Sequence, residues 1–165
     1  MRLVLEEEQR DHYGRWLAHL QLPDDTKVDE ILLKEGLASA IAIPPNFSQV
    51  RRLFEAETVA RAARRGLWGN AYSTPVPAES LDPTRTGFQF VRGRVTHVGH
   101  SRKYVYLDMG AHFALRIGHA DWKQYFRGHP DDWRGALIEA RGWISEQKGR
   151  LHMGIGHPAM LQRLP

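Results

Sequence analysis

The chain of 165 residues carries 23 Lys and Arg against 19 Asp and Glu, and 42% of its residues are hydrophobic, which predicts a folded protein with a buried core. It contains no cysteine, which excludes disulfide scaffolds, thiolate metal sites and cysteine nucleophiles. Its apolar runs are shorter than the ~18 residues of a membrane span, and its first residues turn acidic too early for a secretory signal. We therefore expect no membrane contact and, by default, a cytoplasmic protein.

The positive charge is concentrated in one part of the chain. Residues 1–70 hold 10 basic and 11 acidic side chains, whereas residues 88–165 hold 12 basic and 6 acidic ones. Between them, residues 71–87 are rich in Pro and Ser and lack hydrophobic periodicity, which is typical of an extended connector. The sequence thus predicts a domain over 1–69, a linker over 70–87 and a second domain over residues 88–165, whose basic excess suits a polyanionic partner.

The first domain begins with the pattern of a β-hairpin. A strand-like run from Arg2 to Gln9 is followed by the polar turn Asp11–Gly14, which leads into Arg15. The apolar run Trp16–Leu20 then ends at the turn residues Pro23–Asp25. These signals predict two antiparallel strands with an arginine at the mouth of their turn.

Two helical patterns follow the hairpin. In the first, Val28, Ile31 and Leu32 recur at helical spacing, and Gly36 stands where a C-terminal glycine with positive φ is expected. The second begins after Pro44-Pro45, with Asn46 or Ser48 as its cap, and ends at the run Gly66–Gly69. Its predicted apolar stripe, interrupted by Glu57, consists of Val50, Leu53, Phe54, Ala60 and Ala63.

The second domain has a different periodicity. Its strand-like stretches are Phe88–His97, Tyr104–Met109, Phe113–Ile117, Leu137–Ile144 and Leu151–Ile155. Residues 121–135, between the third and fourth stretches, contain four aromatic residues and are compatible with a helix. Five strands with a helix after the third is the order of an OB-type barrel. We therefore predict a β-rich α+β protein whose second domain is an OB-like five-stranded barrel.

Alternation along these strands divides their side chains between two faces. The residues expected inside are Val91, Val95, Val105, Leu107, Ile138 and Ile144. The residues expected outside are Phe90, Arg92, Arg94, Tyr104, Tyr106, Arg116, Arg141 and Trp143. The outer set offers cations for phosphates and rings for bases, and stacking contributes about 1–3 kcal/mol per base in single-stranded nucleic acid. Packing against a neighbouring domain is the alternative interpretation, because arginine stems also cover apolar surface.

No metal site is predicted. The chain has nine histidines, but no pair shows the spacing of a helical metal motif with an acidic partner. The acidic run Glu6–Glu8 is better explained as an edge strand with alternate residues in solvent.

Five strings of the first domain follow one another in the order and spacing of a known domain. They are Asp11–Ala18, Leu22–Asp25, Val28–Ala38, Pro44–Asn46 and Ala62–Gly69. Together they resemble the second half of a staphylococcal-nuclease-like (thermonuclease) domain, over residues 1 to about 69. The second domain resembles, less closely, the small OB-like domain that follows the nuclease domain in some bacterial members. That resemblance rests on Gly93–Val95, Val105–Leu107, Ala140–Ile144 and His157-Pro158.

The resemblance implies roles for a few residues. In this family a five-stranded OB barrel carries a calcium-dependent phosphodiesterase site, and the hairpin would supply its fourth and fifth strands. Arg15 matches a catalytic arginine that binds the scissile phosphate, a task suited to a guanidinium. Tyr13 is kept as a candidate contact to nucleic acid, whereas Ile41 and Ile43 replace tyrosines that line the nucleotide pocket in many members.

The resemblance also predicts what this chain lacks. The first three strands, with the calcium-binding aspartates, the glutamate associated with activating water and a second arginine, would precede its first residue. One arginine replaces neither a metal nor a base, so we expect a truncated, nucleic-acid-binding protein that is inactive alone and holds no cofactor, calcium being expected for an intact member.

Two other functions stay open. One is an active calcium-dependent endonuclease, completed by an upstream segment or a partner chain. The other is a protein-interaction module. Exposed strand edges and apolar faces predict a homodimer, a complementing chain or a soft first domain.

Overall fold

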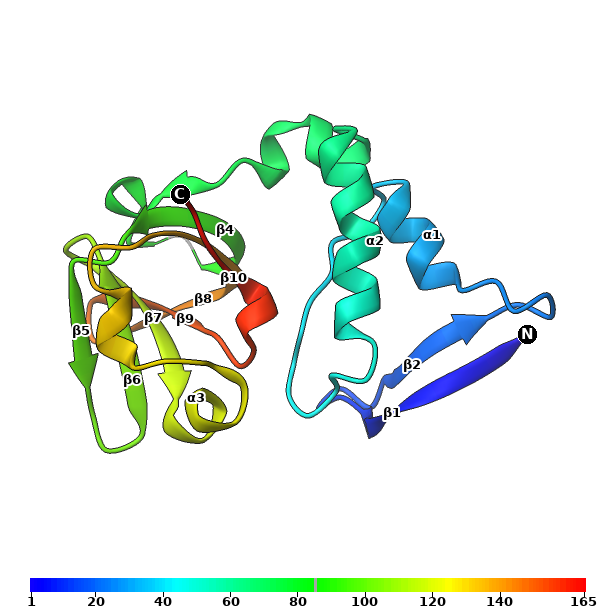
Figure 1. Cartoon of the computed structure of the whole chain (residues 1–165), viewed down its shortest axis with the longest axis horizontal. Coiled ribbons are helices and arrows are strands. Elements are labelled where there is room, and N and C mark those ends of the chain that lie inside the picture. Colours follow the sequence, from blue (N-terminus) through cyan, green and yellow to red (C-terminus); the bar gives the residue numbers. More distant parts are fainter. Residues whose placement is uncertain (85) are drawn as a thin grey trace. The chain divides into compact units, whose positions relative to one another are not determined.

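The computed structural model describes residues 1–84 and 86–165 and divides into two compact units, Met1–Thr74 and Pro75–Pro165 (Figure 1). The division falls inside the predicted linker. Part of that linker is structured. It contains a short strand, β3 (Val76–Pro77), which pairs in parallel with the strand Gly87–Arg94. Two 3₁₀ turns flank β3: η2 (Ala71–Ser73) and η3 (Ala78–Ser80). In the described part of the chain, no helix is long and apolar enough to cross a membrane.

The first unit contains the predicted hairpin and both predicted helices. Strands β1 (Arg2–Arg10) and β2 (Trp16–Gln21) pair antiparallel, with a register irregularity on the side of their turn. Helices α1 (Val28–Lys34) and α2 (Val50–Ala62) follow, and α2 leads to a 3₁₀ turn, η1 (Gly66–Gly69). Figure 1 shows the two helices side by side.

The core between the helices is small, and one charged side chain belongs to it. Leu33, Ala40 and Ala56 are its buried members. Glu57 is only 1% exposed, and its carboxylate accepts a hydrogen bond of 2.7 Å from the backbone N–H of Ala40. The predicted apolar stripe was thus wrong at Ala63, which is exposed. Glu57, which interrupts the stripe, faces inward because it satisfies the segment that follows α1.

The predicted cap of α2 was also wrong. The N-cap residue is Gln49, without a side-chain hydrogen bond to the helix. Asn46 instead pairs with the backbone of Glu8 on β1, donating from Nδ2 at 2.9 Å and accepting at Oδ1 at 2.8 Å. Ser48 donates to the carboxylate of Glu6 at 2.8 Å. Both polar side chains therefore tie the loop before α2 to the hairpin.

Two glycines bring the ends of the helices together. Gly36 and Gly66 have φ values of +68° and +52°, and the N–H of Leu67 donates to the carbonyl of Gly36 at 2.9 Å. A Cβ atom on Gly36 would lie 2.2 Å from the carbonyl oxygen of Arg65, and one on Gly66 would lie 2.2 Å from that of Gly36. The contact requires glycine at both positions, which confirms the predicted positive φ at Gly36.

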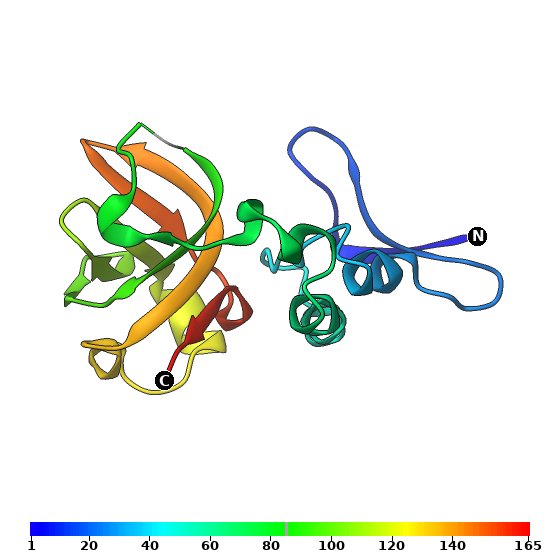
Figure 2. The ribbon, with the colours of Figure 1, turned by 90° about the horizontal axis from the view of Figure 1, so that it is seen from above.

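The second unit is built on one curved sheet. Its strands are β4 (Gly87–Arg94), β5 (His97–His100), β6 (Tyr104–Met109), β7 (Phe113–Gly118), β8 (Leu137–Gln147), β9 (Arg150–Gly154) and β10 (Leu161–Arg163). The pairing order is β3-β4-β8-β9-β7-β6-β5, and β10 pairs with β8. All neighbours except β3–β4 and β7–β9 are antiparallel. The long β8, orange in Figure 2, curves across this unit.

All five predicted strands are present, and the protein is a β-rich α+β protein. The first predicted strand, Phe88–His97, corresponds to β4, which ends at Arg94, and only its last residue belongs to β5. The predicted helix is shorter than expected: α3 (His119–Tyr125) is separated from a 3₁₀ turn, η4 (Pro130–Trp133), by Gly128, whose φ is +76°. Among the described strands, the pairing contains no closing pair, so the barrel stays a prediction.

The interior of the second unit follows the predicted alternation with two exceptions. The six residues expected inside, from Val91 to Ile144, are all at most 4% exposed. Phe90 and Arg141, predicted to lie outside, are only 3% and 6% exposed. They are opposite each other on β4 and β8, with the guanidinium 5.9 Å from the ring centroid. The outer face of the sheet is therefore buried at these two residues. Alternation along a single strand shows which face a side chain is on, but not whether that face is covered.

The glycine contact can be tested by a matched pair of substitutions. Gly14 also has a positive φ, of +79°, but a Cβ atom there meets nothing within 4 Å. We expect Gly14→Ala to cost about 1 kcal/mol of stability from backbone strain alone. Gly36→Ala adds a backbone clash and should cost about 3 kcal/mol or more. Native-state amide exchange of α2 measures both, and equal losses would contradict the close contact.

Candidate functional site

The turn of the hairpin presents Arg15. One carboxylate organises this turn: Oδ1 of Asp11 accepts from the backbone N–H groups of Tyr13 and Arg15, both at 2.9 Å. Its other oxygen accepts from Nε of Arg15 at 2.7 Å. The side chain of Arg15 is 73% exposed, and its guanidinium lies 5.2 Å from the ring centroid of the exposed Tyr13. In the described part of the chain, its terminal amino groups make no hydrogen bond, so that edge can receive an anion.

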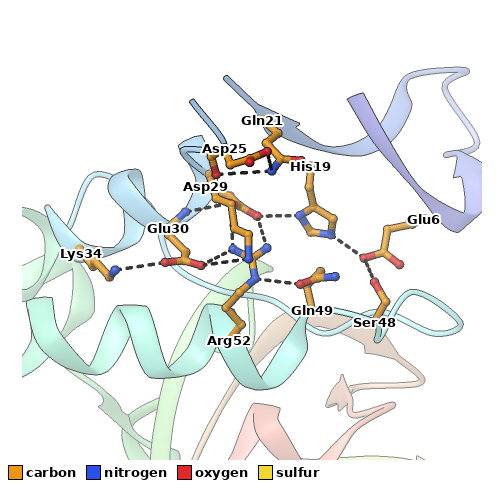
Figure 3. A network of polar contacts seen from close by, with 11 residues as sticks. Glu6, His19, Gln21, Asp25, Asp29, Glu30, Lys34, Ser48, Gln49 and Arg52 are labelled. Carbon is orange, nitrogen blue, oxygen red and sulfur yellow. Dashed lines mark hydrogen bonds and ion pairs between the residues drawn. The ribbon is translucent and has the colours of Figure 1, made fainter. Parts of the chain in front are cut away.

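A polar network joins the hairpin to both helices (Figure 3). His19 on β2 lies between two carboxylates, with Nε2 2.5 Å from Glu6 of β1 and Nδ1 2.7 Å from Asp29 of α1. Arg52 of α2 contacts the same Asp29 at 3.1 Å and Glu30 at 2.6 Å. The network thus connects β1, β2, α1 and α2 through partly buried charges.

The network holds its carboxylates in the charged form. Burial raises the pKa of Asp29, but hydrogen bonds from Arg52 and His19 outweigh burial, and the net pKa is lowered. Hydrogen bonds from Arg52 and Lys34 likewise lower the pKa of Glu30. These charges are matched within the unit, so we assign them to stability. Sequence reasoning missed the network because its members are distant in the chain.

The acidic and histidine side chains of the described residues are not arranged as a ready metal site. Among the described residues, no group of three or more His, Cys, Asp or Glu side chains is arranged to hold a metal ion. Ile41 and Ile43, which replace the expected pocket tyrosines, are 38% and 48% exposed.

The predicted outer residues of the second unit form two groups at different places in the strand order. The first group lies on β4 and β8. There Arg92 pairs with Glu139 at 2.9 Å, and Arg94 donates to the carbonyl of Gly135 at 2.5 Å. Trp143 is 50% exposed, with its ring 5.0 Å from that of Phe88. Arg92 and Arg94 are therefore both engaged by other groups of the fold.

The second group, on β6 and β7, presents its cation over aromatic rings. Tyr106 is directly opposite Arg116, and the guanidinium of Arg116 lies 4.8 Å from the ring centroid of Tyr104. The rings of Tyr104 and Tyr106 are 6.2 Å apart, and all three side chains are partly exposed. In the described part of the chain, Arg116 forms no salt bridge. This arrangement combines a phosphate-binding cation with stacking surfaces.

Four further residues lie beside this group, and sequence reasoning did not select them for it. Arg150 on β9 contacts Asp108 of β6 at 2.7 Å, and Asp108 also contacts His97 of β5 at 3.1 Å. The ring of His152, also on β9, lies 5.9 Å from that of Tyr106. The sequence did contain a signal for Arg150 and His152, because residues 150–154 alternate between polar and apolar side chains. Only the apolar positions were used, to predict the strand.

His152 is the unusual member of this cluster. It is 8% exposed, and among the described residues its Nδ1 atom has no hydrogen-bond partner. Burial lowers the pKa of His152, and the positive charges of Arg116 and Arg150 lower it further. Asp108 and a backbone hydrogen bond to Arg150 act in the opposite direction. The cluster therefore buries a neutral imidazole beside two guanidinium groups.

Comparison with known proteins shows a relationship for the first unit. Residues 1–70 match the model of the family described as staphylococcal nuclease homologue. The first unit is similar to this family. Over 70 residues the chain is 34% identical to the thermonuclease of Staphylococcus hyicus, which is 42% of this chain and 41% of that relative. The chain thus spans about two fifths of the relative's length.

The comparison confirms the family resemblance of the nuclease-like unit. It does not test which half of a nuclease domain the unit corresponds to, so that assignment stays a prediction. The matched region includes Tyr13, Arg15 and the whole polar network, and it ends before the second unit begins.

The polar network makes a prediction about stability and pH. Arg52→Gln removes the cation between Asp29 and Glu30 and should destabilise the first unit by about 1–3 kcal/mol at neutral pH. A carboxyl group whose pKa is lower in the folded state than in the unfolded state stabilises the fold at pH values above its unfolded-state pKa. This stabilisation is lost as the pH falls through its folded-state pKa. The wild type should therefore lose stability below about pH 4, and the variant should lose less.

Amide exchange of α1 and α2 between about pH 6 and pH 3 measures this difference. Arg51→Gln is the matched control, because Arg51 is the neighbouring residue and its side chain is 92% exposed. A loss in the control as large as in Arg52→Gln would show that the network is unimportant.

Proposed function

We propose that the protein binds single-stranded nucleic acid through the β6–β7 group of its second unit, in a chain that also carries a nuclease-like first unit. The observation that carries this proposal is the guanidinium of Arg116 over Tyr104, with Tyr106 beside it on the same face. A phosphate pairs with the cation while bases stack on the rings, and such stacking tolerates any sequence. The name of the matched relative, a thermonuclease, supports a nucleic-acid partner.

Charge around the group supports the same partner. The exposed Arg102 and Lys103 lie in the turn between β5 and β6, and the exposed Lys148 lies between β8 and β9. These turns adjoin the strands that carry Tyr104, Tyr106 and Arg150. A basic surface of this kind attracts a polyanion over distances near the Debye length.

The strand order supports the OB-type interpretation of the second unit. Strands β7 and β9 are parallel, α3 follows β7, and β4 and β5 stand at or next to the two ends of the pairing path although they are consecutive in the chain. We infer that β4 and β5 form one bent first strand that closes the sheet, which gives an OB barrel of five strands.

The first unit contributes Arg15 as a phosphate-binding residue, with Tyr13 beside it. Hydrolysis also needs a group that activates water. It needs more positive charge to stabilise the transition state than one guanidinium supplies. We therefore propose that the 165-residue chain by itself binds nucleic acid without cleaving it.

Nucleic-acid binding can be tested by comparing two arginines. Arg116→Gln should weaken binding of a fluorescein-labelled oligodeoxythymidine of about 12 nucleotides by about tenfold, because it removes a phosphate contact and a stacked cation. Arg92→Gln should change the affinity less than twofold, because Arg92 is paired with Glu139. Fluorescence anisotropy over a salt series measures both, and log Kd should rise linearly with log salt concentration.

Two results would contradict this proposal. Equal losses from Arg92→Gln and Arg116→Gln would mean that charge alone attracts the oligonucleotide. Binding of a protein partner without binding of oligodeoxythymidine or oligouridine would favour a protein-interaction module.

Calcium-dependent endonuclease activity is the second candidate function, and the surface of the hairpin favours it. Leu3, Leu5 and Trp16 are 54%, 42% and 53% exposed, and β1 and β2 pair only with each other among the described strands. A further chain segment or a partner chain that covers these side chains would also complete the surroundings of Arg15.

Activity measurements separate the two candidates. The purified chain should show no calcium-dependent cleavage of single-stranded DNA or RNA. If a complementing chain restores cleavage, Arg15→Ala should lower kcat/KM by at least about a hundredfold, because it removes charge stabilisation from the scissile phosphate. Arg51→Ala, also in the first unit and exposed, should have no effect. Cleavage by the purified chain alone, abolished by a chelator, would overturn the proposal of a non-cleaving protein.

A further inference from the structure

We propose that His152, Arg116 and Arg150 form a phosphate site that takes up a proton when single-stranded nucleic acid binds. The inference rests on the proposed function and names the part of the β6–β7 surface at which the backbone phosphate is held. It makes the imidazole of His152 a functional group, and it makes the affinity for nucleic acid depend on pH.

The register of the sheet places the three residues together. Ala114 of β7 is opposite His152 on β9, and Arg116 and Arg150 lie two positions from this pair on the same face. Ala114 is small and fully buried. Across β9, the residue opposite His152 is Ser145 of β8. The two residues opposite His152, Ala114 and Ser145, are small and uncharged. The positive groups that act on the imidazole are therefore Arg116 and Arg150.

The charges around His152 favour an anion. Tyr106 and Asp108 face it from β6, Arg116 from β7 and Arg150 from its own strand, whereas Ser145 on β8 is uncharged. Asp108 is shared between Arg150 and His97, so it offsets only part of the positive charge. Nε of Arg150 is, like Nδ1 of His152, a buried nitrogen without a hydrogen-bond partner among the described residues.

Two buried nitrogens without partners, of which Nε of Arg150 is a donor and Nδ1 of His152 becomes one on protonation, point to an oxygen-rich ligand. Leaving such groups unpaired costs about 1–3 kcal/mol each, and a phosphate supplies several acceptor oxygens at once. The long Arg116 and Arg150 side chains are partly exposed and lie two positions to either side of the Ala114–His152 pair, so they can turn toward a phosphate held beside the imidazole. A base adjoining that phosphate can then stack on Tyr104 or Tyr106.

Proton uptake follows from the same charges. Without a ligand, burial and the two arginines hold the pKa of His152 below its ordinary value of about 6.5. A bound phosphate neutralises the arginines and accepts a hydrogen bond from the imidazolium, which raises that pKa. Because linkage is reciprocal, binding must tighten as pH falls through the interval between the two pKa values and level off above it.

The proposal is tested by the pH dependence of binding. Labelled oligodeoxythymidine and oligouridine of about 12 nucleotides are titrated with the full chain at about pH 6 and about pH 8. We expect the wild type to bind about three- to tenfold more tightly at the lower pH. His152→Gln should remove most of this difference, whereas His97→Gln, which alters an exposed histidine beside Asp108, should retain it. Oligouridine and oligodeoxythymidine should behave alike, because the site reads phosphate.

A second measurement does not depend on a variant folding. The imidazole signals of wild-type His152 are followed by NMR, with and without the oligonucleotide, as pH is varied. The proposal requires the midpoint of its titration to rise on binding. A wild type that binds with equal affinity at both pH values, or whose His152 midpoint does not move, overturns it while leaving nucleic-acid binding intact. Failure of the wild type to bind at either pH overturns both.

Discussion

The arginines of this protein differ in how completely carboxylates engage them. Arg52 lies between Asp29 and Glu30, and Arg92 lies against Glu139, so both cations are neutralised inside the fold. Arg116 lies over an aromatic ring instead. Arg15 and Arg150 lie between the extremes, because each pairs with one aspartate through only part of its guanidinium. A guanidinium without a nearby carboxylate keeps its attraction for phosphate, and a ring beneath it adds stacking without cancelling the charge.

Pairing of charges also explains how the first unit is stabilised. The core between α1 and α2 has few large side chains, and part of the contact is made by glycine backbones that approach closely. Apolar burial of this extent contributes little at about 25 cal/mol per Å². Glu57, His19 and Arg52 therefore carry much of the specific contact, since a partly buried charge needs its partner in one geometry. Leu3, Leu5 and Trp16 of the hairpin stay exposed and add little to this stability.

The sequence predicted the local structure well because local structure depends on spacing. Alternating apolar residues located the strands of the second unit, and Gly36 located the end of α1. Contacts between distant segments could not be predicted in the same way. Glu139 opposes Arg92 only because β4 and β8 pair in one register, and Glu57 faces inward only because the N–H of Ala40 needs an acceptor. A single strand or helix contains neither fact.

The same limit applied to the candidate site, where the residue types were right but their grouping was not. Arginines and aromatic residues on the strands of one sheet seemed equivalent, yet pairing separated the β4–β8 arginines from Arg116. His152 was overlooked because only the apolar positions of β9 were used to locate the strand. Burial and the charges of Arg116 and Arg150, on neighbouring strand positions, lower its pKa. A weakly basic imidazole beside two cations responds to phosphate because the charges that suppress its protonation are the ones that phosphate neutralises.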